Sequence, residues 1–140
     1  MDKNKIIISI NEKLKEFGVD DCQVNLDASA LVLNIEKEDK IPEYKIAVTP
    51  TSEEAIYIYC AFAHGLTEAK DIRRLFAVCN EFNGESFLKF SLTKKFIKIS
   101  YTIPEFIDDI EYVVRVITVI PNLIAEFYED MLTKVDKIRG

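Results

Sequence analysis

The sequence predicts an α+β domain in which helices flank an antiparallel β-sheet, in the order helix, four strands, helix, two strands, helix. Three observations support this fold class. Apolar and polar residues alternate in several short runs, which is typical of half-buried strands. Apolar residues recur every three to four positions in longer runs, which indicates amphipathic helices. The predicted strands come in groups instead of alternating strictly with helices, and this order argues against a parallel doubly wound sheet.

The first half of the chain predicts one helix and four strands. The helix has an apolar stripe formed by Ile7, Ile10, Leu14 and Phe17. Gly18 follows where a left-handed residue would end it. A β-hairpin over residues 22–35 turns at 27–29, and residues 44–48 form a third strand. Residues 55–62 form the fourth; because they are apolar on both parities, we expect this strand to be central or covered on both faces.

The second helix is predicted to begin at Thr67 as its N-cap, with Glu68 near the positive end of the helix dipole. Its predicted buried face consists of Ile72, Leu75, Phe76, Cys79 and Phe82. Two alternating strands follow over residues 88–92 and 97–103, with a turn at 93–95. We expect the later helices to pack on this pair of strands.

The last helix is predicted to start at a capping box formed by Asp108 and Glu111, with Ile107 and Tyr112 as a hydrophobic staple. Its apolar face continues to Val135, which is long enough to cross a whole sheet. Pro121 lies inside this pattern and lacks a backbone donor. We therefore expect either a kink near residues 117–121 or two helices in sequence.

Composition favours a single cytoplasmic domain over residues 1–140. The net charge of −6 and the pI near 4.9 argue against nucleic acid and against anionic membrane surfaces as partners. No apolar segment approaches the ~20 residues that span a bilayer. The N-terminal segment lacks the pattern of a signal peptide.

No catalytic, metal or cofactor signature emerges from the sequence, so we predict a protein that is not an enzyme. His64 is the only histidine, and without a flanking catalytic motif we interpret it as a structural loop residue instead of a general base. Cys22, Cys60 and Cys79 are widely spaced and are predicted to be reduced, buried thiols instead of zinc ligands. The isolated glycines exclude a phosphate-binding loop.

Asn80 and Asn83 lie at the predicted end of the second helix. One interpretation has both side-chain amides binding a ligand. We favour a structural role, in which they bind carbonyls at the helix end and permit the turn with Gly84.

The candidate site is an amphipathic sheet face. If the alternate residues of the fourth strand face the helices, Tyr57 and Tyr59 must point to the other side, and Phe87 and Phe96 share this opposite parity. Their predicted neighbours are Lys45, Lys89, Lys98 and Ser100. Aromatic rings among polar side chains are typical of protein interfaces. The alternative is that the N-terminal helix or loops simply cover these rings.

The run from Leu75 to Pro104 resembles the YbjN-type family of bacterial domains, which share the fold of type III secretion chaperones. The matching positions are the Cys79-Asn80-x-x-Asn83 helix end, the Leu88/Phe90/Leu92 strand and the segment Ile99-Ser100-Tyr101-Thr102-Ile103-Pro104. The resemblance extends more weakly over nearly the whole chain. It implies a small acidic α+β domain linked to the regulation of sensory transduction. The related chaperones are cytoplasmic homodimers that hold extended client segments on apolar surface without ATP.

Three hypotheses follow from residues and resemblance together. The first is a non-enzymatic protein-binding regulator or chaperone-like module, acting as a cytoplasmic homodimer without a cofactor. The second is a small-molecule sensor with a cavity between sheet and helix, lined by Tyr57, Tyr59 and Cys60. The third, a cryptic enzyme, requires His64 or a carboxylate to lie in a cleft beside a partner.

Overall fold

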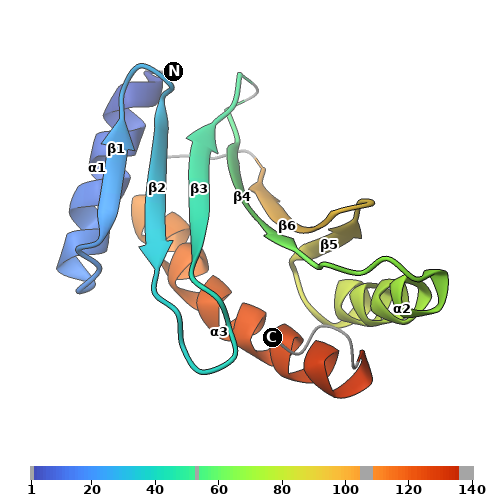
Figure 1. The fold of residues 1–140 in the computed structure, drawn as a ribbon. Coiled ribbons are helices and arrows are strands. Elements are labelled where there is room, and N and C mark those ends of the chain that lie inside the picture. Colours follow the sequence, from blue (N-terminus) through green and yellow to red (C-terminus); the bar gives the residue numbers. More distant parts are fainter. Residues whose placement is uncertain (1, 53, 105–108, 136–140) are drawn as a thin grey trace.

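The computed structural model describes residues 2–52, 54–104 and 109–135, and it has the predicted α+β order. The elements are α1 (Lys3–Glu16), β1 (Cys22–Asn25), β2 (Ala30–Ile35), β3 (Tyr44–Pro50), β4 (Ile56–Ala63), α2 (Ala69–Glu85), β5 (Lys89–Leu92), β6 (Phe96–Ile103) and α3 (Ile110–Lys134), shown in Figure 1. The predicted hairpin turns at residues 27–29 and 93–95 are confirmed, because the flanking strands pair antiparallel.

The six strands form one antiparallel sheet in the order β1-β2-β3-β4-β6-β5. The connection through α2 carries the chain from β4 to the far edge at β5, and β6 then returns to pair with β4 (Figure 1). This topology makes β4 a central strand, as predicted, and leaves β1 and β5 as the two edges.

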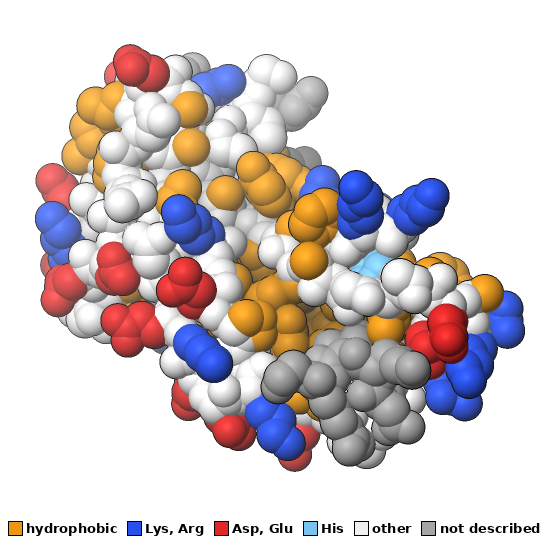
Figure 2. Space-filling model, viewed as in Figure 1, with side chains coloured by type: hydrophobic (Ala, Val, Ile, Leu, Met, Phe, Trp, Pro, Cys, Tyr) orange, Lys and Arg blue, Asp and Glu red, His pale blue; other side chains and the backbone are white. Residues whose placement is uncertain are grey.

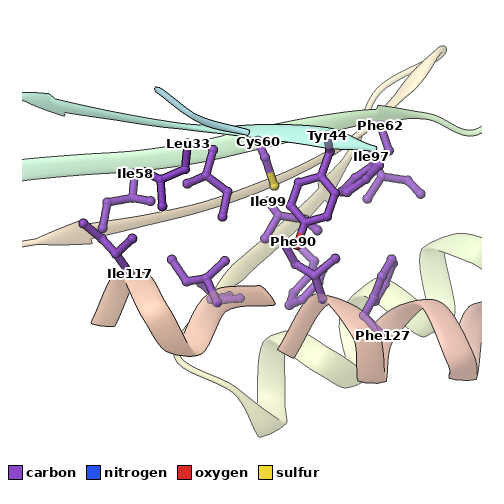
Figure 3. Packing of buried hydrophobic residues seen from close by; sticks show 14 of the residues in the cluster. Leu33, Tyr44, Ile58, Cys60, Phe62, Phe90, Ile97, Ile99, Ile117 and Phe127 are labelled. Atoms are coloured by element: carbon purple, nitrogen blue, oxygen red, sulfur yellow. The ribbon is translucent and has the colours of Figure 1, made fainter. Parts of the chain in front are cut away.

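One hydrophobic core joins all three helices to a single face of the sheet. It includes Ile7 and Ile10 from α1, Leu75 from α2 and Phe127 from α3, and all four are fully buried. Figure 3 shows side chains from the strands pointing down onto α3. Each fully buried aliphatic side chain contributes about 1.5–3 kcal/mol. The helices are therefore held on one side of the sheet.

The first helix ends as the sequence predicts. Gly18 has a φ of +85°, and its N–H donates to the carbonyl of Lys15. The next N–H, that of Val19, donates to the carbonyl of Leu14. These bonds satisfy carbonyls that the helix leaves without partners.

The predicted start of α2 is wrong by one residue. Its N-cap is Glu68, not Thr67, and the Glu68 side chain makes no capping bond. Asp71 instead lies buried in the first turn, where the helix dipole favours a carboxylate. The predicted buried face is wrong at Phe76, which is 55% exposed, while Val78 is buried. Helix α2 contacts the sheet chiefly at β5, so only a narrow stripe of it is covered.

The last helix is continuous from Ile110 to Lys134 and passes through Pro121, so the alternative of two helices is wrong. Its N-cap is Asp109, whose carboxylate accepts the N–H of Tyr112 at 3.0 Å. The predicted capping-box residue Asp108 and the predicted staple residue Ile107 lie outside the described residues.

None of the helices in the described ranges combines the length and the apolar character that crossing a bilayer requires.

Candidate functional site

The candidate site lies on the sheet face that points away from the helices, here called the open face. Alternation along the strands places on it Val32, Lys45, Ala47, Thr49, Tyr57, Tyr59, Ala61, Ala63, Lys89, Ser91, Phe96, Lys98, Ser100 and Thr102. Figure 2 shows hydrophobic side chains gathered over β3 and β4. Helix α1 lies on the other side, because Ile7 and Ile10 belong to the core; it does not cover these rings.

Two of the predicted site residues form an aromatic pair on β4. The rings of Tyr57 and Tyr59 have centroids 5.2 Å apart and planes inclined by 25°, so they stack. The Lys98 amine lies 5.7 Å from each ring centroid, within the range of cation–π attraction. Tyr59 remains 39% exposed. The pair is therefore a fixed aromatic platform that carries a positive charge.

Phe96 belongs to the same face. It pairs with Ala63 across β4 and β6, and its side chain is 45% exposed. Ala61 and Ala63, on the neighbouring strand, are also exposed and too small to cover the ring. The open face thus carries exposed apolar surface at both ends of β4.

Phe87 is not part of this face. Its ring contacts Tyr101 edge-on, with centroids 4.8 Å apart. Tyr101 has the parity of Ile99 and Ile103 and packs against the core, so Phe87 lies with the helix side of the sheet. The parity argument fails because Phe87 precedes β5, where the strand ladder has not yet begun. The contact between the Phe87 and Tyr101 rings was also not predicted from the sequence.

His64 holds the β4–α2 connection to the β5–β6 hairpin. Its Nδ1 accepts the N–H of Leu66 at 3.0 Å, which leaves Nε2 to donate to the carbonyl of Thr93 at 3.1 Å. The ring is 4% exposed. Both nitrogens are engaged with the backbone, so the structural interpretation of His64 accounts for its geometry.

Asn83 has a structural role different from the predicted one. Its side-chain nitrogen donates to the carbonyl of Phe90 at 2.8 Å, and its oxygen accepts the N–H of the same residue. The amide therefore binds the outer edge of β5 instead of the helix end. Asn80 is exposed.

Burial makes two of the thiols weak acids. It raises the pKa of Cys60 to about 12 and that of Cys79 to about 11. Burial, followed by the nearby Asp21 carboxylate, also raises the pKa of the Cys22 thiol. These environments are the opposite of those that activate a cysteine nucleophile. Among the described residues, no group of three or more His, Cys, Asp or Glu side chains could hold a metal ion.

The residues suggested for a sensor cavity do not come together. Cys60 points into the core, while Tyr57 and Tyr59 point to the open face, so these side chains cannot line one cavity. A surface groove of about 730 Å³ lies elsewhere, between the β2–β3 loop and α3. Its lining includes Ile41, Pro121 and Tyr128.

Comparisons of the chain with family models, with curated proteins and with solved structures found no match.

Proposed function

We propose that this protein is a non-enzymatic protein-binding regulator or chaperone-like module that holds segments of a partner on the open face. The observation that carries the proposal is β4, whose residues are apolar on both faces although the helices cover only one. A strand that is covered on one face normally carries polar residues on the other. Exposed aromatic rings at such a position are typical of binding surfaces.

The sheet edges limit how a partner could add hydrogen bonds. The Asn83 amide occupies the outward-facing N–H and C=O of Phe90 on β5. An extended segment pairing with the sheet would therefore use the other edge, at β1. The N–H of Asn34 on β2 donates to the carbonyl of Asp21. Because hydrogen-bonded and non-hydrogen-bonded residues alternate along an antiparallel pair, the N–H and C=O of Cys22 and Val24 point away from β2 and are available to a partner.

We also propose that the chain is a cytoplasmic homodimer and a member of the YbjN-type family, as the resemblance implies. The dimer has a simple test. Light scattering coupled to gel filtration should give twice the chain mass at micromolar concentration, and a strict monomer would remove this part of the proposal.

Photo-cross-linking tests the binding site. We would place p-benzoylphenylalanine at Tyr59 and, as a control, at Val119, which is similarly exposed at 43% against 39% but lies on α3. In the cells that produce the protein, position 59 should give covalent adducts with another polypeptide and position 119 should not. Equal adduct yields from both positions would exclude a preferred open-face site.

A second candidate function, binding of a small molecule, is supported by the groove beside α3. Its volume of about 730 Å³ falls within the range of ligand pockets. A metabolite that binds there should raise the melting temperature, and Ala125→Trp, which fills the groove, should abolish that rise. No stabilisation by any metabolite in a broad screen would argue against this function.

A further inference from the structure

Charge is distributed unevenly between the sheet and the rest of the molecule. The chain has 24 acidic residues and a net charge of −6, yet none of the six described strands contains Asp or Glu. The strands contain three lysines, Lys45, Lys89 and Lys98, and alternation places all three on the open face. The strands of this acidic protein therefore bring only positive charge to the open face.

These three lysines have no carboxylate partners among the described residues. The ion pairs of the described chain join Lys13 to Glu16, Lys70 to Glu68, Arg115 to Glu111, and Lys134 to Glu81 and Asp130, all outside the sheet. Lys98 instead lies over the rings of Tyr57 and Tyr59. Its charge is held close to the aromatic platform and is not neutralised within the chain.

The register places apolar and cationic groups in one row across the sheet. Ala47 on β3, Tyr59 on β4, Ser100 on β6 and Lys89 on β5 are successive partners. Tyr59 thus stands between two small side chains, and Lys89 lies two strands away, at ~10 Å. In a polyproline II segment, which has three residues per turn, side chains three residues apart lie on the same side and span a similar ~9 Å. An apolar contact and an ion pair can therefore be made by one short segment.

We propose that the open face binds an acidic segment of a protein partner, whose apolar side chains pack on Tyr59 and Phe96 while its carboxylates pair with Lys98 and Lys89. This inference rests on the proposed function and adds the chemistry of the partner.

A protein segment fits these observations better than a nucleic acid. The two tyrosine rings stack on each other, so one face of each ring is already engaged and cannot stack on a base. A polyphosphate also needs many cations to release its counterions, whereas the sheet offers three lysines in a chain with a net charge of −6.

Fluorescence anisotropy with the full chain tests the inference. The probes are a fluorescein-labelled 12-residue peptide in which Glu stands three residues after each Leu or Phe, a peptide with Lys in place of Glu, and single-stranded oligo(dT). The acidic peptide should bind at least about tenfold more tightly than the basic peptide, and added salt should weaken it. Lys98→Glu should weaken its binding about tenfold, and Lys98→Gln by less.

The charge-matched control is Lys5→Glu, which reverses an exposed lysine on α1 and should change the affinity less than twofold. Equal affinity for both peptides, no binding of either, preference for oligo(dT), or equal effects of the two charge reversals would each overturn the acidic-segment assignment. If a neutral apolar peptide binds, and its binding is abolished by Tyr59→Ser but unchanged by Lys98→Glu, only the acidic-segment assignment is overturned. An absence of cross-links from position 59 would remove the proposed function itself.

Discussion

Asn83 shows how one side chain can complete a sheet edge. It lies near the end of α2, and its amide binds both backbone polar groups of Phe90 on β5. The amide acts like one residue of a seventh strand and satisfies groups that an edge otherwise leaves open. It also ties α2 to the strand that this helix covers.

Asn83→Ala should lower the free energy of unfolding by about 1–3 kcal/mol, because two hydrogen bonds are lost at once. Asn80→Ala, three residues earlier on the same helix, should change it by less than about 0.5 kcal/mol. Urea denaturation monitored by circular dichroism measures both values. Equal effects of the two substitutions would show that the bonds to Phe90 contribute little.

The buried thiols predict a loss of stability at alkaline pH. Cys60 has a pKa of about 12 and Cys79 of about 11 in the folded chain, against an ordinary value of 9.0. Above pH 9 the unfolded chain loses these protons while the folded chain keeps them. The contribution of these two thiols to the free energy of unfolding should therefore be constant below about pH 8 and fall as the pH rises from about 9 to 11.

Cys60→Ala isolates the contribution of one thiol. The substitution also changes the free energy of unfolding at every pH, but only the slope of that free energy against pH reports the titrating group. The variant should show a shallower decline between pH 9 and 11, measured by urea denaturation at each pH. An unchanged slope would mean that the Cys60 thiol titrates normally in the folded protein.

At the scale of elements, β4 separates two environments along one strand. Ile58 is 2% exposed and faces the helices, whereas the adjacent Tyr59 is 39% exposed on the open face. Ile58→Ser should cost more than about 3 kcal/mol, because it opens a cavity and buries a hydroxyl. Tyr59→Ser should cost about 1 kcal/mol or less. Chemical denaturation compares them, and similar costs would contradict a one-sided sheet.

Pro121 interrupts the backbone bonding of α3 without ending the helix. It has no N–H to donate to the carbonyl of Ile117, the acceptor four residues earlier. Pro121→Ala should raise the free energy of unfolding by about 1–3 kcal/mol, since proline is about 3 kcal/mol less favourable than alanine inside a helix. A thermal melt measures the change. A lower melting temperature would show that the packing of α3 on the sheet requires the proline.

At the scale of the whole molecule, periodicity predicted the elements and much of the site. Alternation correctly separated Ile58 from Tyr59, and Phe96 from Ile97, because side-chain direction in a strand is a local property. It failed at Phe87, whose position depends on Tyr101 in another strand. The strand order could not be predicted from local patterns either. Nothing in the sequence of β6 indicates that it pairs with β4 as well as with β5.

Alternation predicted that Lys45, Lys89 and Lys98 share one face of the sheet, but their spacing across that face depends on the strand order. Lys45, Lys89 and Lys98 are far apart along the chain, and the sheet brings them to one surface. Most ion pairs of the described residues are instead local, and the contact of Lys134 with Glu81 joins two helices. The net charge of −6 alone conceals this separation.

The open face should be bare in the purified protein and covered in its complexes with partners. Hydroxyl-radical footprinting measures this directly, with the purified protein and with complexes isolated from the cells that make it. Tyr59 and Phe96 should be oxidised rapidly in the purified protein and protected in the complexes, while Phe76 and Val119 react equally in both. Protection of Tyr59 and Phe96 already in the purified protein, or protection in the complexes no stronger than that of Phe76, would contradict an open binding face.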